Sequence, residues 1–362
     1  MDPVRPTSDS QWNALKAGAI PEVEEVRPGI HAIALDMPGM QPPYAYCYAV
    51  LEGGGSRAVH LIDAGLDTDE NWAAFGAALA ALGRELSDVA TVTLTHLHFD
   101  HTGLANRIRE ASGATVRMHV DEAAAIREGL QFSAGHDVGD MLGEWGVPAE
   151  FRESLLAIAN SRADFGSVVI IDEEIADGEL LDLGDYRARV IHTPGHTTGH
   201  ICLALEGTRA GDPTGGAAAG GPAGAAADAT AVAGAVFTGD HVLPGINPGI
   251  ALGGKRSADP LGEYYASLDR LAPYAELEAL PGHGYRFATL GGRCAQIRAH
   301  HEARTVQAAE RLAAEPDLNV WDLASTLSWT GGWEALPLVS RISALAQTDM
   351  HRARVRTAAA AN

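Results

Sequence analysis

The chain of 362 residues has few of the features that stabilise small secreted proteins or anchor proteins in membranes. Its three cysteines, Cys47, Cys202 and Cys294, lie far apart and form no CxxC pair. This spacing supports neither a disulfide framework nor a thiolate zinc site, so we expect three reduced and mostly buried thiols. Because no run of about 18 apolar residues occurs, we expect no membrane-spanning helix.

Basic residues are also scarce. Lys and Arg total 26 against 47 Asp and Glu, and the formal net charge is -21 at pH 7. A nucleic-acid binder must neutralise phosphates with basic side chains, so nucleic acid is not an expected partner. Residues 1–20 lack a basic segment followed by an apolar stretch, the pattern of a secretory signal, and we therefore expect a cytoplasmic protein.

Hydrophobic residues make up 46% of the chain, enough for a substantial core. Between residues 25 and 290 strand-like and helical patterns alternate, which is typical of an α/β layered domain. Residues 208–233 are almost wholly small and predict a disordered surface loop inside this domain. Residues 1–24 are interpreted as an N-terminal extension, and residues 291–362 as a helical appendage.

Two further segments are less regular. Residues 137–164 have a helical pattern and are interpreted as a lid or an insert over the functional site. Residues 168–172, VVIID, form a short apolar run.

The most informative stretch is THLHFDHTG at 95–103, which follows a predicted strand at 91–95. It places His96, His98, Asp100 and His101 within six positions. Imidazole nitrogens suit zinc and its first-row neighbours, and a carboxylate adds a hard oxygen ligand. The i, i+2 histidines can converge on one ion while Asp100 and His101 point to a neighbouring position, so the spacing predicts two metal ions.

Three more ligand-type residues lie on loops directly after predicted strands, where α/β folds build their sites. They are His196 in TPGHTTGH, Asp240 in TGDHV and His283 in PGHG. Other histidines are given lesser roles. His200 and His241 are expected to pack or to hydrogen-bond a ligand, His192 to be a strand side chain, and His300 and His301 to face solvent from a helix.

The segments LIDAG, THLHFDHTG, TPGHTTGH, TGDHV and PGHG resemble, in order and spacing, the motifs of the metallo-β-lactamase fold superfamily. The resemblance covers residues 25–290 and implies an αββα sandwich. The segment DPLGEYYASLDRL before PGHG, together with the helical C-terminal region, is similar to the glyoxalase II and lactamase-beta-like branch. In that branch residues 291–362 would form a unit, winged-helix-like in one interpretation, that walls the active-site cleft or contacts a second copy in a homodimer.

The resemblance also implies a role for each motif residue. His96, His98 and His196 would hold one metal, Asp100, His101 and His283 the other, and Asp240 would bridge both. Asp63 of LIDAG would orient a ligand from behind, as metal-bound imidazoles commonly require. Two Zn²⁺ ions are expected, although Mn²⁺ or Fe²⁺ would accept the same ligands.

Two metal ions about 3.5 to 4 Å apart can lower the pKa of a shared water towards neutrality. Asp100 and Asp240 are the expected catalytic residues, which orient that water and carry its proton. The expected function is hydrolysis of a small acyl thioester or lactone. Two alternatives stay open: a phosphodiesterase or nuclease of the same fold, and a non-catalytic interaction module that a metal stabilises.

Overall fold

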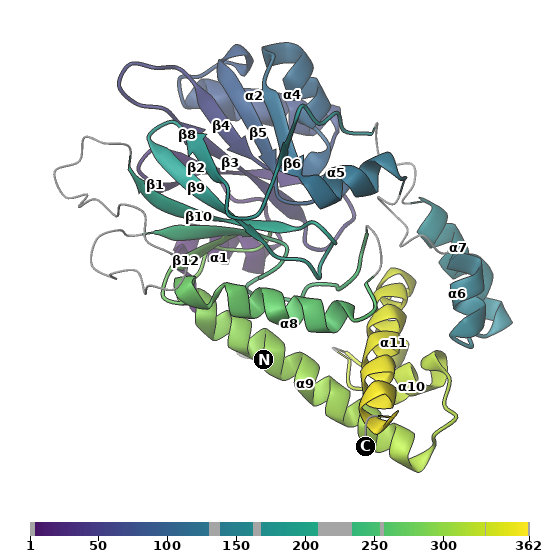
Figure 1. Ribbon diagram of the computed structural model, residues 1–362. Coiled ribbons are helices and arrows are strands. Elements are labelled where there is room, and N and C mark those ends of the chain that lie inside the picture. The colour runs from purple at the N-terminus through teal and green to yellow at the C-terminus, as the bar shows by residue number, and fades with distance from the viewer. Residues whose placement is uncertain are drawn as a thin grey trace.

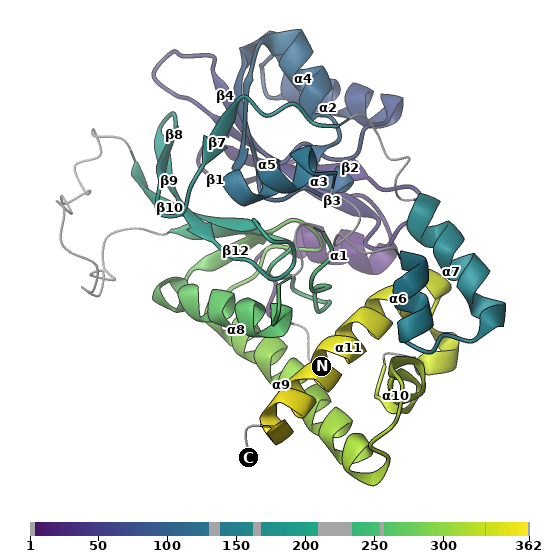
Figure 2. The same ribbon diagram turned by 45° about the vertical axis from the view of Figure 1, so that its right-hand side comes forward.

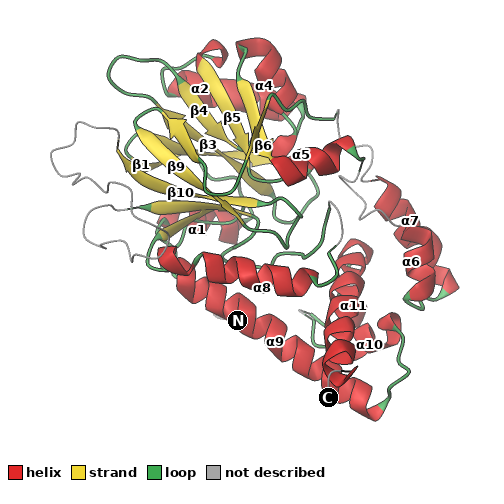
Figure 3. Ribbon diagram, viewed as in Figure 1, coloured by secondary structure: helices red, strands yellow, loops and turns green. Residues whose placement is uncertain are grey.

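The computed structural model describes residues 4–129, 138–161, 168–208, 234–253, 257–329 and 331–360. Two β-sheets pack face to face, and helices cover the outer face of each sheet (Figures 1 and 3). This arrangement confirms the predicted αββα sandwich. None of the helices that the structure describes is long and apolar enough to cross a membrane.

The first sheet has the strand order β1-β2-β3-β4-β5-β6-β7. Its first four strands are antiparallel neighbours, and β4 to β7 are parallel. The parallel strands end at one edge of the sheet, so residues that follow β4 and β5 lie together. The strands are β1 (Glu24–Arg27), β2 (Ile30–Asp36), β3 (Tyr44–Leu51), β4 (Val59–Ile62), β5 (Val89–Leu94), β6 (Thr115–His119) and β7 (Glu173–Ile175).

The second sheet has the order β12-β11-β10-β9-β8. Only β11 and β12 run parallel, and the other neighbours are antiparallel. The loop from β9 to β10 and the ends of β11 and β12 therefore meet at one edge. The strands are β8 (Leu180–Leu183), β9 (Tyr186–His192), β10 (Ile201–Thr208), β11 (Ala235–Gly239) and β12 (Glu278–Pro281).

Three apolar cores hold the layers together. One lies between the first sheet and the helices α2 (Asp69–Ala81) and α4 (Ala105–Ser112). The second lies between the two sheets. The third joins the second sheet to α1 (Asp9–Ala17), α8 (Pro260–Arg270) and α9 (Leu290–Ala314). The remaining elements of this part are α3 (Phe99–Thr102), α5 (Val120–Arg127) and the short 3₁₀ helices Leu86–Asp88 and Ala272–Tyr274.

A separate helical unit forms from two segments that are far apart in the sequence. Helices α6 (Val138–Glu144) and α7 (Ala149–Ser161) lie beside α10 (Val320–Thr326) and α11 (Leu338–Ala360) (Figure 2). Trp145 and Leu155 share a core with Trp321, Leu345 and Trp333, the last from the 3₁₀ helix Trp333–Ala335. The segment expected as a lid or insert therefore packs with the C-terminal helices.

Single segments and side chains can be compared with the sequence predictions. The short apolar run at 168–172 precedes β7 and forms no strand. His301 does not face solvent: α9 packs against both α8 and α11, and the His301 ring is fully buried. The Gly/Ala-rich segment lies outside the described residues apart from Thr208, which ends β10. The three cysteines are free and buried, as predicted.

Candidate metal centre

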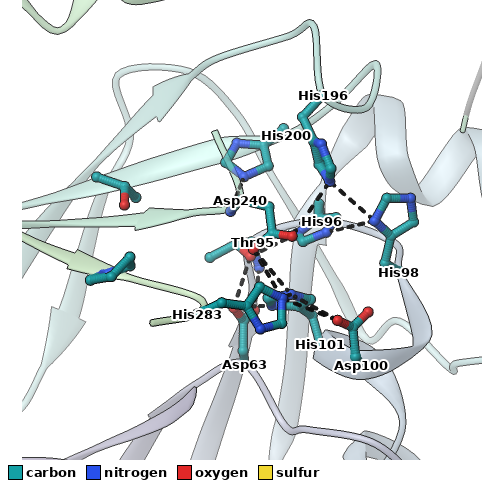
Figure 4. Close-up of polar contacts among 12 residues, drawn as sticks. Asp63, Thr95, His96, His98, Asp100, His101, His196, His200, Asp240 and His283 are labelled. Atoms are coloured by element: carbon teal, nitrogen blue, oxygen red, sulfur yellow. Dashed lines mark hydrogen bonds and ion pairs between the residues drawn. The ribbon is translucent and has the colours of Figure 1, made fainter. Parts of the chain in front are cut away.

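Four loops at the edges of the two sheets bring the seven candidate ligands together (Figure 4). The loop after β5 and the first turn of α3 supply the HLHFDH side chains, and the β9–β10 loop supplies His196. Asp240 follows β11, and His283 follows β12. All seven candidate ligands that the sequence predicted lie in this one cluster.

Three histidines form the first group. His96 Nε2 and His196 Nε2 lie 3.0 and 3.1 Å from His98 Nδ1. These nitrogens thus face a common point, and the rings of His96 and His98 stand nearly perpendicular, at 79°. Such a convergence of three imidazole nitrogens is the geometry of a metal site with an open position.

The second group combines two histidines with carboxylates. His283 Nε2 lies 3.2 Å from Asp100 Oδ2, and His101 Nε2 lies 3.6 Å from the same oxygen. Asp240 reaches both groups: its Oδ1 is 3.3 Å from His283 Nε2, and its Oδ2 is 3.8 Å from His196 Nε2. Asp240 therefore lies between the two groups, the position that a bridging ligand requires.

Every histidine of the cluster is held from behind through its other ring nitrogen, as metal-bound imidazoles commonly are. Each acceptor takes the ring proton on that side, so in the neutral form of each imidazole the nitrogen that faces the cluster carries the lone pair. The partners are the Thr95 hydroxyl for His96, which itself donates to Asp63, the Leu252 carbonyl for His98, the Asp63 carboxylate for His101, the Gly249 carbonyl for His196 and the Tyr44 carbonyl for His283.

The electrostatics of the two groups differ. Burial and the neighbouring His98 lower the pKa of His196 to about 4, so this imidazole is neutral. Burial also lowers the pKa of His283, but Asp240 and Asp100 outweigh it and raise that pKa to about 10. The second group therefore pairs protons with buried carboxylates, and a divalent cation could replace those protons.

The donor set fits metal ions. Asp240 Oδ1 is buried and has no hydrogen-bond partner among the described residues, although ring nitrogens lie within 3.4 Å. Three overlapping groups of ligand atoms, each within 4.8 Å, cover the seven side chains. Nitrogen and carboxylate donors at these spacings suit zinc and neighbouring first-row ions. Whether the seven side chains are ligands stays a prediction.

The residues behind the cluster include several that the sequence did not single out. His200 Nε2 accepts the backbone N–H of Asp240, which confirms the expected supporting role of His200. The hydroxyls of Tyr44 and Tyr46 donate to the Gly284 carbonyl, and that of Tyr48 donates to Pro281. These three side chains alternate along β3 and fix the turn that carries His283. Only the YxYxY pattern of β3 could have indicated this role.

Comparison with known proteins agrees with this geometry. The family model described as the metallo-beta-lactamase superfamily matches residues 41–210. A probable metallo-hydrolase, YqjP of Bacillus subtilis, is 28% identical over 233 residues, which cover 63% of this chain and 64% of the relative. A hydroxyacylglutathione hydrolase of Maricaulis maris is 53% identical over 32 residues, 9% of this chain and 12% of that protein. The chain spans 60% and 64% of the first two curated relatives it matches.

A solved structure extends the likeness over nearly the whole chain. The metallo-beta-lactamase family protein from Thermus thermophilus is 25% identical, with a TM-score of 0.70 over 92% of this chain and 95% of that one. Sequence motifs, two-sheet fold and clustered histidines and carboxylates thus point the same way. Residues 41–210 match the metallo-beta-lactamase superfamily, and most of the chain shares the fold of a solved member of that family.

Proposed function

We propose that the protein is a hydrolase that works with two bound metal ions. The observation that carries this proposal is the placement of Asp240 between two groups of ligand-type side chains. A structural zinc site closes with four ligands and needs no bridging carboxylate. The seven convergent side chains therefore favour an enzyme over a non-catalytic module.

In this proposal His96, His98 and His196 hold one ion, and Asp100, His101 and His283 hold the other. Two such ions would polarise a substrate carbonyl and bring the pKa of a water close to neutrality. Zinc is the ion that we propose, on the strength of the histidine-rich first group.

The protein's own residues would then handle the water and its proton. Asp100 and Asp240 keep 7% and 8% of their surface exposed, whereas His96 and His101 are fully covered. The carboxylates therefore border the accessible side of the cluster. A carboxylate oxygen at this position can orient a water for attack and accept its proton, which then passes to the leaving group.

For the substrate we propose a small acyl thioester or lactone, whose thiolate or alkoxide needs little help to leave. The similarity to a hydroxyacylglutathione hydrolase supports the thioester. The arginines that could hold glutathione carboxylates are engaged elsewhere. Arg286 pairs with Glu24 and Glu278, Arg298 pairs with Asp269, and Arg293 and Arg304 donate to backbone carbonyls. We therefore favour a thioester substrate whose thiol portion does not carry several carboxylates.

The test is a substrate panel with metal-free and zinc-reconstituted protein. Acyl thioesters, lactones, nitrocefin and a phosphodiester reporter are assayed for wild type, Asp100→Asn and the control Asp69→Asn, whose side chain is 92% exposed. We expect wild type to turn over a thioester or a lactone, a chelator to abolish this activity and zinc to restore it. Of the two variants, only Asp100→Asn should lose the activity. Turnover of the phosphodiester alone would contradict the proposed substrate class, and zinc-independent turnover would contradict the mechanism.

A further inference from the structure

The loop that carries His196 is held from an element outside the metal centre. The three residues after His196 are Thr197, Thr198 and Gly199. The Thr197 hydroxyl and the Gly199 N–H donate to Glu122 of α5, and the Thr198 carbonyl is hydrogen-bonded to His192. The His192 ring stacks on His119, the last residue of β6. This contact region, formed by His119, Glu122, His192 and residues 197–199, is called the α5 clamp below.

Glu122 is the main contact of the α5 clamp. It lies in the first turn of α5 and is fully buried. Its Oε1 accepts a hydrogen bond from the Thr197 hydroxyl and another from the Gly199 N–H at 3.2 Å. A Cβ at Gly199 would lie only 2.5 Å from the Glu122 backbone nitrogen, so glycine is required for this close approach.

The second contact is a pair of stacked histidines. The rings of His119 and His192 lie 4.1 Å apart and are nearly parallel, at 15°. His192 Nε2 donates to the Thr198 carbonyl at 3.0 Å, and His119 Nδ1 accepts the N–H of Asp121. Asp121 Oδ2 lies 3.6 Å from His192 Nε2. Because the two rings are parallel, their in-plane lone pairs point side by side and do not converge on one ion. We therefore assign His119, Asp121 and His192 to support of the loop and not to a metal site.

We infer that Glu122 is a positioning residue for His196 and so for the first metal ion. This inference rests on the proposed function, in which His196 is a ligand. Thr197 is covalently next to His196, and Glu122 fixes the Thr197 hydroxyl from the opposite side of the loop. Without that contact the His196 ring would sample positions in which Nε2 does not face the other two histidines.

Glu122 acts as a hydrogen-bond acceptor and not as a charge. No basic side chain contacts its carboxyl group among the described residues. Burial raises its pKa to about 8, so the group is mostly protonated at neutral pH. A glutamine has the same shape and keeps the accepting oxygen, whereas an alanine has neither. The glutamine variant should therefore preserve the geometry that the alanine variant loses.

The experiment measures Co²⁺ and Zn²⁺ affinity of metal-free protein by competition with a chromophoric chelator, and records the visible spectrum of the Co²⁺ form. The variants are Glu122→Ala, Glu122→Gln and Thr197→Val. The control, Leu323→Ala, is made in a buried cluster of the C-terminal helices and tests for loss of stability alone. Glu122→Ala and Thr197→Val should each weaken the first ion about tenfold, the lower end of the range for outer-shell changes.

Glu122→Gln and Leu323→Ala should bind both ions as wild type does, and the double variant of Glu122→Ala with Thr197→Val should be no weaker than Glu122→Ala. If Glu122→Ala does not fold, Thr197→Val still decides. Unchanged affinity in Thr197→Val, or equal losses in Glu122→Gln and Glu122→Ala, would overturn the role of Glu122. If wild type binds no ion that depends on His196, the proposed function itself fails.

Discussion

Replacing Asp63 with asparagine isolates the support behind the second metal ion. Asp63 Oδ1 accepts the Thr95 N–H at 2.7 Å, and Oδ2 accepts the Thr95 hydroxyl at 2.9 Å and His101 Nδ1 at 2.8 Å. The backbone of Asp63 has a positive φ of 61°. Asparagine, like aspartate, tolerates this conformation better than most residues with a side chain, so Asp63→Asn changes the hydrogen bonding without straining the turn.

The amide can satisfy only part of this pattern. Whichever way it is oriented, its NH₂ group faces a donor, either the Thr95 N–H or the His101 Nδ1–H. In the second case the proton of His101 moves to Nε2, and the lone pair that faces the second ion is lost. A supporting residue of this kind contributes about 10- to 100-fold in metal affinity. That factor equals about 1.4 to 2.7 kcal/mol.

The assay is a titration of metal-free wild type and Asp63→Asn with Zn²⁺ against a competing chelator, followed to two ions per chain. We expect the weaker binding step to lose about 10- to 100-fold in affinity and the His96 group to lose less. Asp67→Asn is the control, because Asp67 lies four residues on and, within the part of the chain that the structure describes, its carboxylate forms an ion pair only with Arg107. Equal affinity of Asp63→Asn and wild type for both ions would refute the reasoning.

Three further outcomes are expected. The double change Tyr44→Phe with Tyr46→Phe removes both hydroxyls from the Gly284 carbonyl and should lower the free energy of unfolding by about 1 to 3 kcal/mol and weaken the second ion. Burial lowers the pKa of His351 to about 3, so its contribution to stability is present above the unfolded pKa of about 6.5 and is lost as pH falls. Wild type should therefore lose about 1.4 kcal/mol per pH unit below that point relative to His351→Asn. Trp145→Ala should cost about 3 to 5 kcal/mol of stability and leave metal affinity unchanged.

Each of these has a direct measurement. If the tyrosine double variant has the same free energy of unfolding in urea as wild type, the role of β3 in fixing the His283 turn is contradicted. Parallel pH profiles of wild type and His351→Asn between pH 4 and 7, about the range set by the two pKa values, would show that His351 is not buried in its neutral form. A Trp145→Ala protein with altered metal binding would show that the helical unit contributes to the metal centre.

The sequence predicted the fold and the seven clustered side chains because both depend on local patterns. The strand before THLHFDHTG, and the Gly and Pro residues around His196 and His283, place each side chain at the end of a strand. Parallel strands in each sheet, and the loop between the antiparallel strands β9 and β10, then bring these ends together where the edges of the two sheets meet. The resemblance of the five motifs to the metallo-β-lactamase fold superfamily implied which of these side chains meet.

The supporting contacts could not be predicted in the same way. Gly249 and Leu252 act through backbone carbonyls, which leave no trace in the side-chain pattern. Glu122 reads as an ordinary acidic residue in the first turn of a helix, and only its burial against Thr197 shows its role.

The packing partners of the helices were also beyond the sequence. The apolar face of α7 predicts that the helix is buried, but it does not identify α11, almost two hundred positions along the chain, as the partner. For the same reason His301 was expected in solvent. The helices of His301 and His351 look amphipathic and basic, yet both histidines lie on the faces where α9 and α11 meet.

The central claim is that seven side chains bind two ions that share Asp240. Native mass spectrometry of zinc-reconstituted protein tests it most directly, with wild type beside His283→Ala and His196→Ala. The account predicts two zinc ions per chain in wild type and one in each variant. A single ion in wild type that survives both substitutions, or no ion at all, would contradict it.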